Sequence, residues 1–309
     1  MGVQIPLIKM SGTGNTFVLV DAVRHRLSPR QGAWGPLAQA LCDPRSGGGA
    51  DGLLVLERSR KANVRMRIFN PDGSEPSMCG NGVRCLAWYA SRQGAGKRLT
   101  IETRAGIKRA EIGQGNRVRV DMGAPALVRH MPRFPLEGRT SVHADLIDAG
   151  VPHLVCWVRR VDAVAVERLG RRWRVDRRFQ PAGTNVDFLE LQAVQERSGD
   201  DRGARVRRCR IKLRTYERGV EAETQACGTG AVAAAAAVAH ALARDRRGSP
   251  RAGAWFEVEA HVPGGVLRVQ VGARYTVNRG GIQLTHAVLE GTVREQSRRV
   301  VRWDGPGSR

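Results

Sequence analysis

The chain has 309 residues, enough for two domains, and 41% of them are hydrophobic, so it can build sizeable cores. It contains no apolar run of the roughly 18 residues that a membrane-spanning helix needs, and its N-terminus lacks the features of a signal peptide, so we expect a cytosolic protein. The formal net charge is +22, and only five of the 51 cationic residues are lysine. We interpret this arginine excess as a surface property, with at most non-specific, salt-sensitive affinity for nucleic acid.

The first part of the chain predicts short strands that alternate with turns and two helices. The expected helices are residues 37–41, which end before Pro44, and residues 83–92, which end before Gly94. The expected strands are residues 5–9, 17–20, 53–56, 65–69, 99–103, 108–112 and 117–121.

A second part of the same kind begins after Gly123-Ala124-Pro125. Helices are expected at residues 161–169 and 231–243, and a basic turn at 244–253. The expected strands are residues 154–158, 186–191, 210–216, 255–261, 266–271, 282–284 and 288–293. We therefore expect an N-terminal half of residues 1–123 plus 287–293, a C-terminal half of residues 124–286, and a basic, disordered tail of residues 294–309.

The helix expected at residues 231–243 is apolar nearly all round, with His240 its one polar break. A helix without a polar face is buried, and its small side chains let other elements approach closely. The pattern therefore predicts an α/β fold in which strands wrap around a central helix, once in each half.

A Cys-Gly-polar-Gly motif occurs twice, at Cys79 and at Cys227, and each copy opens an apolar helical run. A thiolate just before a helix meets unpaired N–H groups and the positive end of the dipole, so we expect a pKa below its ordinary value of about 8.5. One such motif alone is better explained as a helix entry with a buried cysteine. Two matched copies favour two half-sites with opposed thiols, as a cofactor-free racemase needs to remove a proton from one face of a carbon and return it to the other.

The other four cysteines are expected to be small core residues, because a large cytosolic chain argues against disulfides and no C-x-x-C spacing suggests a metal site. Some polar residues are weaker candidates for substrate binding. Glu217 and Arg218 precede the second motif, and an Arg there can take a carboxylate, although a surface ion pair is as good an explanation. His153 and the turn residues Asn15, Asn70 and Asn185 have equally plain structural explanations when each is considered alone.

With both motifs in view, the chain resembles the diaminopimelate epimerase family. The resemblance follows the family's order over roughly residues 5–293 and is highly specific. It rests on the stretches Lys9–Asn15, Ala50–Leu53, Phe69–Glu75, Met78–Cys85, Gly183–Val186, Tyr216–Gly219 and Glu223–Gly230.

The resemblance implies two similar α/β halves, each a barrel-like mixed sheet around a central helix, in an enzyme that is usually a homodimer. It implies a cofactor-independent, metal-free epimerase that interconverts LL- and meso-diaminopimelate in lysine and peptidoglycan precursor biosynthesis. By position, Cys79 and Cys227 match the catalytic thiols. Backbone donors to the α-carboxylate match Gly80, Asn81, Gly228 and Thr229. Substrate-binding residues match Asn15, Asn70, Asn185, Glu217 and Arg218, and positions that tune the thiol pKa values match His153 and Glu217.

The chain departs from the family pattern at a few positions. Ser11, Thr16 and Gly52 stand where the family often has His, Asp and Gln, and Val151 replaces the Asn of a Gly-Asn-Pro-His turn, which removes one substrate-contacting amide. Two alternatives therefore stay open: a two-cysteine racemase or isomerase of another amino acid on the same scaffold, and a basic nucleic-acid-binding protein that retains the fold. Both thiols are present, which argues against the second alternative.

Overall fold

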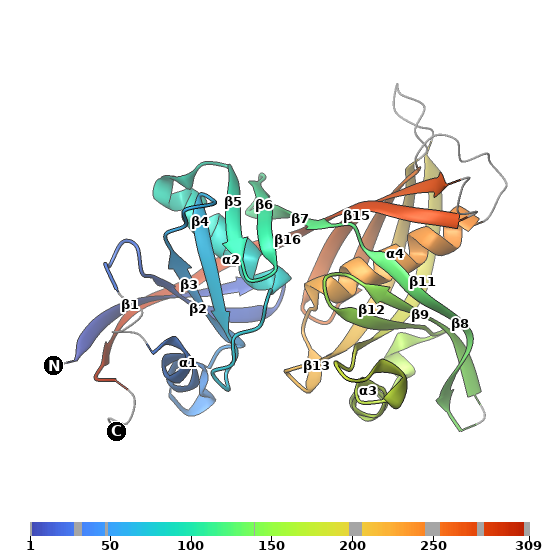
Figure 1. Cartoon of the computed structure of the whole chain (residues 1–309), viewed down its shortest axis with the longest axis horizontal. Coiled ribbons are helices and arrows are strands. Elements are labelled where there is room, and N and C mark those ends of the chain that lie inside the picture. The colour runs from blue at the N-terminus through green and yellow to red at the C-terminus, as the bar shows by residue number, and fades with distance from the viewer. Residues whose placement is uncertain are drawn as a thin grey trace. The chain divides into compact units, whose positions relative to one another are not determined.

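The computed structural model describes residues 2–27, 33–46, 49–138, 140–197, 206–244, 254–276 and 281–305. The chain forms two compact units, one of Met1–Val120 with Gly291–Arg309 and the other of Asp121–Glu290 (Figure 1). The basic turn predicted at residues 244–253 lies, apart from Arg244, outside the described residues.

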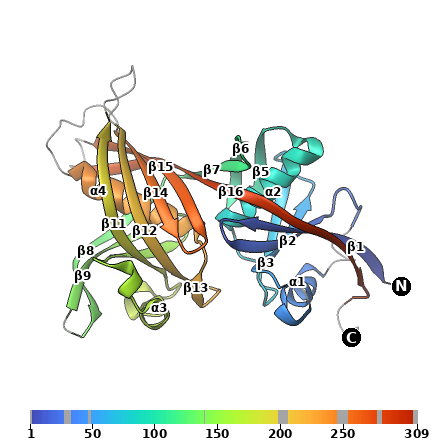
Figure 2. The ribbon, with the colours of Figure 1, turned by 180° about the vertical axis from the view of Figure 1, so that it is seen from behind.

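The first unit is a closed ring of strands around helix α2 (Gly80–Ala90), all of whose residues are buried. Strands β1 to β7 follow one another in chain order, and β16 closes the ring by pairing with β1 and lying next to β7. Figure 2 shows β16 running alongside β1. The strands are β1 (Val3–Gly12), β2 (Asn15–Asp21), β3 (Gly52–Glu57), β4 (Val64–Phe69), β5 (Arg98–Thr103), β6 (Gly106–Ile112), β7 (Arg117–Gly123) and β16 (Gly281–Trp303).

The second unit wraps its strands around helix α4 (Gly228–Arg244), whose small side chains allow the close approach that the sequence predicts. The strand order is β8-β9-β10-β11-β12-β14-β15-β16, and β13 pairs only with β12. The strands are β8 (Ala126–Glu137), β9 (Thr140–Asp148), β10 (Pro152–Trp157), β11 (Asn185–Arg197), β12 (Val206–Glu217), β13 (Ala222–Thr224), β14 (Ala254–Val262) and β15 (Gly265–Thr276).

The two units repeat the same chain path. The parallel pairs β2/β3 and β4/β5 of the first unit correspond to β10/β11 and β12/β14 of the second. Parallel neighbours need a crossover, and each one contains a helix: α1 (Trp34–Cys42) and α2 in the first unit, α3 (Val166–Arg174) and α4 in the second. The described residues also form short helical turns of the 3-10 type, at Pro44–Ser46, Val161–Ala163 and Arg177–Phe179, and of the π type, at Ser91–Ala95.

The predicted fold class, a mixed sheet around a central helix in each half, is confirmed, but two local predictions are wrong. The hairpin β8/β9 was not predicted, because Pro132 and Pro135 disfavour a strand. The structure accommodates both prolines because β8 is an edge strand, last in the strand order, and its pairing with β9 contains register shifts. The tail predicted to be disordered instead continues β16 as far as Trp303, and its residues pair with β1 from Val3 to Ser11. That pairing covers what would otherwise be an open sheet edge, which outweighs the tail's charged composition.

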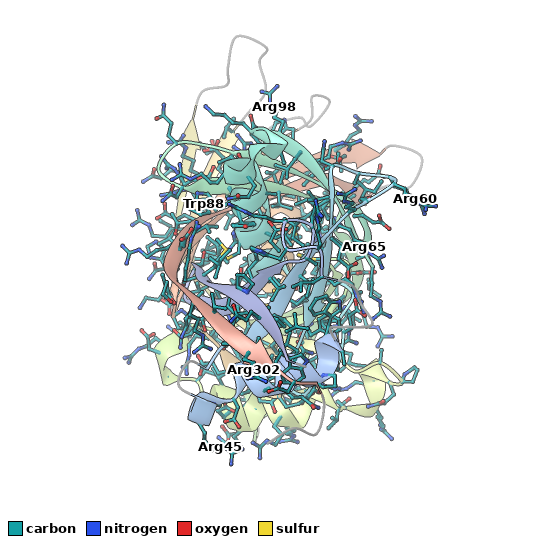
Figure 3. All side chains as sticks on the ribbon, turned by 90° about the vertical axis from the view of Figure 1, so that its left-hand side faces the viewer. Arg45, Arg60, Arg65, Trp88, Arg98 and Arg302 are labelled. Carbon is teal, nitrogen blue, oxygen red and sulfur yellow. The ribbon has the colours of Figure 1, made fainter. Side chains whose placement is uncertain are left out.

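The excess positive charge lies on side chains that project to solvent. Figure 3 shows Arg45, Arg60, Arg98 and Arg302 extending away from the ribbon of the first unit. The side chains of Arg45 and Arg98 are 90% and 85% exposed although each pairs with a carboxylate. In the part of the chain that the structure describes, none of the helices has the length and apolarity to cross a membrane.

Candidate active site

Cys79 is the N-cap of α2, where its extended backbone lets the thiol face the first turn of the helix. The N–H of Gly82 donates to the Sγ of Cys79 at 3.3 Å, and the first helical hydrogen bond runs from the N–H of Val83 to the Cys79 carbonyl. A Cβ at Gly82 would lie 2.8 Å from a methyl of Leu54, so a larger residue there would have to displace that buried side chain. The first-turn N–H groups of such a helix have no partner within it and can hold an anion.

The second turn of α2 carries a buried arginine, Arg84. Arg84 is fully buried, and its guanidinium donates to the carbonyl of Gly80, the side-chain oxygen of Asn81 and the hydroxyl of Thr13. Among the described residues it has no carboxylate partner, and its Nε has no hydrogen bond. Burial lowers the pKa of Arg84 to about 10, against the opposing effects of Cys85 and Cys79, so a positive charge stands close to the first thiol.

Asn15 bonds to Asn81 in this half-site, and Asn70 bonds within its own turn. Asn81 donates from its side-chain amide to the Oδ1 of Asn15 at 2.8 Å, and Asn15 contacts the carboxylate of Asp51. Asn70 follows β4 and donates to the Ser74 hydroxyl in the turn that the sequence predicts.

Cys227 has the same relation to α4 that Cys79 has to α2. The N–H of Gly230 donates to the Cys227 Sγ at 3.3 Å, and the first helical bond runs from Ala231 to the Cys227 carbonyl. A Cβ at position 230 would lie 2.6 Å from the carboxylate of Asp187, so a larger residue there would disturb its bonds to His153 and Thr215. The repeated motif therefore produces the same thiol geometry twice.

A chain of hydrogen bonds connects Cys227 to a buried carboxylate. The Sγ of Cys227 is 3.4 Å from the hydroxyl of Thr229, which is 2.9 Å from the Nε2 of His153. The Nδ1 of His153 lies 2.7 Å from Asp187, which also accepts a bond from Thr215. If Nδ1 carries the proton that bonds to Asp187, Nε2 accepts from Thr229, whose oxygen is then free to accept from the thiol.

The environment of Cys227 overturns the prediction of a lowered thiol pKa. Burial raises the pKa of Cys227 well above its usual range, and the carboxylates of Glu217 and Asp187 raise it further. The hydrogen bonds from Thr229 and Gly230 oppose this shift but do not outweigh it. Burial also raises the pKa of Glu217, which accepts a bond from Thr224. The surroundings of Cys227 therefore favour the protonated thiol over the thiolate.

Asn185 and Arg218 lie at the edge of the same half-site. Asn185 begins β11, contacts the Nε2 of His153 at 3.4 Å, and accepts from the backbone N–H of Arg218 at 2.8 Å. The guanidinium of Arg218 donates to the carbonyl of Ala182, and within the described chain it forms no ion pair, with Glu217 or any other carboxylate. The surface ion pair considered from the sequence is therefore wrong.

The remaining four cysteines are core residues, as predicted. All are buried, and burial raises the pKa of Cys42 and Cys85 to about 12 and of Cys209 to about 11, and that of Cys156 still further. Within the described ranges, the side-chain group that could hold a metal ion contains neither motif cysteine; it consists of His130, His143 and Asp145.

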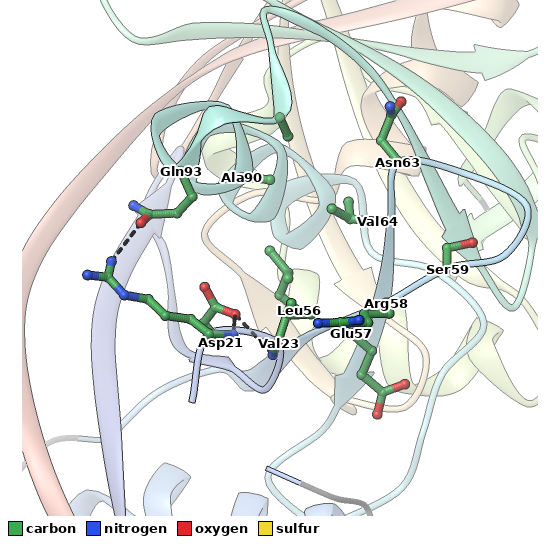
Figure 4. A pocket seen from close by; sticks show the side chains of 12 residues that line it. Asp21, Val23, Leu56, Glu57, Arg58, Ser59, Asn63, Val64, Ala90 and Gln93 are labelled. Atoms are coloured by element: carbon green, nitrogen blue, oxygen red, sulfur yellow. Dashed lines mark hydrogen bonds between the residues drawn. The ribbon is translucent and has the colours of Figure 1, made fainter. Parts of the chain in front are cut away.

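A hollow of about 490 Å³ in the first unit lies away from the thiol (Figure 4). It is lined by Asp21, Arg24 and Ala90 among others, and Ala90 is at the opposite end of α2 from Cys79. Its lining holds neither cysteine nor histidine, so it offers no group for the chemistry considered above.

Sequence reasoning missed the two fully buried charged residues of these half-sites, Arg84 and Asp187. Each is a single charged residue within an apolar stretch, Val83-Arg84-Cys85 and Val186-Asp187-Phe188. A lone charge in a buried element needs partners inside the protein, and that pattern was the available signal.

Comparisons with known proteins agree with these motifs. Residues 7–128 and 146–285 match the sequence profile of the family described as Diaminopimelate epimerase. A diaminopimelate epimerase of Desulforudis audaxviator is 39% identical over 280 residues, covering 85% of this chain and 90% of the relative. One from Archaeoglobus fulgidus is 40% identical over 253 residues, covering 75% and 81%.

Solved structures share the fold at low sequence identity. A phenazine biosynthesis protein of the PhzF family from Bacillus anthracis has a TM-score of 0.65 at 18% identity, with 97% of this chain and 99% of that one covered. A hydroxyproline epimerase from Agrobacterium vitis has a TM-score of 0.62 at 17% identity, with 98% and 94% covered. The family match and the identity to its members over most of their length show that this chain belongs to the diaminopimelate epimerase family and is an isomerase.

Proposed function

We propose that the protein interconverts LL- and meso-2,6-diaminopimelate by a two-thiol mechanism, in the cytosolic synthesis of lysine and peptidoglycan precursors. The observation that carries this proposal is the pair of cysteines placed identically at the starts of the two central helices. Thiols at both positions supply an acid and a base, so the reaction needs neither an organic cofactor nor a metal. The members of the family to which the chain belongs carry the same activity in their names.

The charges around the two thiols suggest how they divide the work. A positive charge stabilises a thiolate and nearby carboxylates oppose one. Arg84 stands near Cys79, whereas Glu217 and Asp187 stand near Cys227. In the resting enzyme Cys79 is then the base and Cys227 the acid.

In one direction the Cys79 thiolate takes the α-proton, and the electron pair of the broken C–H bond moves into the α-carboxylate. The first-turn N–H groups at Gly80, Asn81, Gly228 and Thr229 stabilise the charge that develops there. Cys227 then gives its proton to the opposite face, which inverts the carbon and leaves Cys227 as the thiolate. The reverse reaction exchanges the two roles.

In this proposal the residues that bind the substrate, several of them at its second amino-acid end, are Asn15, Asn70, Asn185, Glu217 and Arg218. Arg218 has a guanidinium without a carboxylate partner among the described residues, as a ligand for the distal carboxylate should. We also propose that the enzyme works as a homodimer and that any nucleic-acid binding is non-specific.

Solvent-deuterium exchange followed by NMR tests the function. LL-diaminopimelate should gain deuterium at one α-carbon and convert to the meso form, whereas proline, hydroxyproline, glutamate and lysine should not exchange. Cys79→Ala and Cys227→Ala should each lower turnover by about 100-fold or more, because neither face can replace the other. Faster exchange of another amino acid would point to the alternative racemase, and near-normal turnover of either single variant would contradict the two-thiol mechanism.

A further inference from the structure

The second unit contains a further group of reactive side chains, on the paired strands β8 and β9. His130 on β8 is directly opposite Asp145 on β9 in the antiparallel register, and His143 is two residues before Asp145 on the same face of β9. His130 and His143 are each about one-third exposed, whereas Asp145 is buried. Opposite and alternate positions on paired strands bring side chains to one face, so the sheet itself holds the three together.

Three of their atoms form a small triangle. The Nδ1 of His130 is 2.8 Å from the Oδ1 of Asp145, the Nε2 of His143 is 3.2 Å from the same oxygen, and the two nitrogens are 3.1 Å apart. If the Asp145 carboxylate is ionised, both imidazole nitrogens must donate to it, and the edge between the two nitrogens then has no acceptor, so the three edges are not all hydrogen bonds. A single cation between the three atoms satisfies all of them at once. Ligands of a tetrahedral zinc ion lie about 3.3 Å apart, close to these edges.

Neighbouring groups hold the triangle in the form that a metal needs. The indole N–H of Trp157 donates to Asp145 Oδ2 at 2.9 Å, which leaves Oδ1 for the two imidazoles. The ring of Trp157 stacks on His143 with an interplanar angle of 8° and so fixes its orientation. A further imidazole, that of His240 on α4, lies near the cluster. Burial lowers its pKa, and it interacts electrostatically with Asp145, His130 and His143. Outer partners of this kind orient metal ligands and tune their affinity.

We propose that His130, His143 and Asp145 form a binding site for a divalent transition ion of the zinc type, separate from the catalytic thiols. Imidazole nitrogen excludes Mg²⁺ and Ca²⁺, which take oxygen ligands, and favours zinc and its neighbours. The site shares β10 with the catalytic half-site, but His153 and Trp157 stand at opposite ends of that strand, about 13 Å apart at the rise of an extended chain. A bound ion would therefore join β8 to β9 and stabilise the second unit without contacting the substrate.

Zinc titration of the untagged, full-length protein tests the proposal. Cys79→Ala and Cys227→Ala are introduced together as the background, because the two motif thiols could also bind zinc. Calorimetry should show one Zn²⁺ per chain, and Zn²⁺ should raise the Tm. His130→Gln and His143→Gln should each weaken binding at least about tenfold and abolish the rise in Tm, and Trp157→Phe, which keeps the stacking but loses the N–H, should weaken binding about tenfold.

His261→Gln is the matched control, since His261 is another partly exposed histidine of the same unit that contacts a carboxylate, Glu259. It should bind Zn²⁺ as the background protein does. Co²⁺ should give an absorption spectrum without a thiolate charge-transfer band. The proposal is overturned if the background protein does not bind Zn²⁺ saturably, or if correctly folded His143→Gln, checked by circular dichroism, binds it with unchanged affinity. These outcomes do not depend on epimerase activity.

Discussion

Replacing Asp187 by Asn probes how the second thiol is controlled. Asp187 is fully buried, and its two oxygens bond to the Nδ1 of His153 and to the hydroxyl of Thr215, both at 2.7 Å. Asn keeps the size of the side chain but loses the negative charge and offers only one acceptor oxygen. The substitution therefore disturbs both the His153 tautomer and the charge that opposes a thiolate at Cys227.

The structure fixes the direction and scale of both effects. The charge of Asp187 raises the pKa of Cys227, so its removal should lower that pKa. A hydrogen bond to a charged group contributes about 1.5–3 kcal/mol. If the lost bond acts on the transition state, turnover should fall about 10- to 100-fold.

The assay is a pH titration of thiolate absorbance in a Cys79→Ala background, where Cys227 is the remaining site thiol. A variant that combines Cys79→Ala with Cys227→Ala supplies the baseline for the four core cysteines, whose pKa values burial also raises to about 11 or higher. Asp187→Asn should move the Cys227 titration to lower pH. Asp162→Asn is the control, since it removes a carboxylate exposed on the surface and paired with Lys212. An unchanged Cys227 titration in Asp187→Asn, or an equal shift in Asp162→Asn, would refute the reasoning.

Four further outcomes are expected. Gly230→Ala should lower stability by about 1–3 kcal/mol in urea unfolding, because its Cβ would lie 2.6 Å from Asp187, whereas Gly113→Ala, with a nearest contact of 3.6 Å, should be tolerated. Arg218→Lys should lower kcat/KM for diaminopimelate by a factor that corresponds to roughly 1–3 kcal/mol, with the fold intact, since lysine cannot form the bidentate bond to a carboxylate. Unchanged kinetics would show that Arg218 does not bind the distal carboxylate. The folded state holds the proton of Glu217 more tightly than the unfolded chain does, so the free energy of unfolding falls as pH rises above the ordinary Glu pKa. Glu217→Gln should reduce this loss of stability. A variant whose stability falls with pH as steeply as that of the wild type would contradict this. Deleting Arg294–Arg309 should destabilise the first unit by at least about 4.5 kcal/mol, taking about 0.5 kcal/mol for each of the nine β1 residues that pair with the deleted segment, and an unchanged urea midpoint would show that this pairing does not matter.

The sequence predicted the central helices because each is a long apolar run after a cysteine motif, and most strands because their apolar residues fall between clear turns. It expected helix starts at residues 83 and 231, and the structure begins α2 at Gly80 and α4 at Gly228, directly after each cysteine. It failed where a strand depends on its neighbours more than on its own residues. The last ten residues of β16 are mostly exposed and highly charged, so only the edge offered by β1 makes them a strand.

The same distinction applies to the half-sites. The backbone geometry around each thiol could be predicted, because a Cys-Gly-x-Gly sequence at a helix start leaves few conformations. The pKa of Cys227 could not, because it depends on burial and on carboxylates that come from β11 and β12. Local sequence predicted the effect of the helix dipole alone, and tertiary structure reversed its sign.

The difference between the half-sites has a chemical reason. A two-thiol epimerase can begin turnover only with one thiol and one thiolate, and two identical environments would often hold both thiols in the same protonation state. The repeat gives the two thiols the same backbone geometry, with a distance of 3.3 Å from the donating backbone nitrogen to Sγ at Cys79 and at Cys227. The buried charges around them differ in sign, positive at Arg84 and negative at Asp187. In the proposed mechanism, buried charges of opposite sign near the two thiols, which come from different places in the two units, give the resting enzyme a defined base and a defined acid, while the shared backbone geometry lets the roles exchange with each turnover.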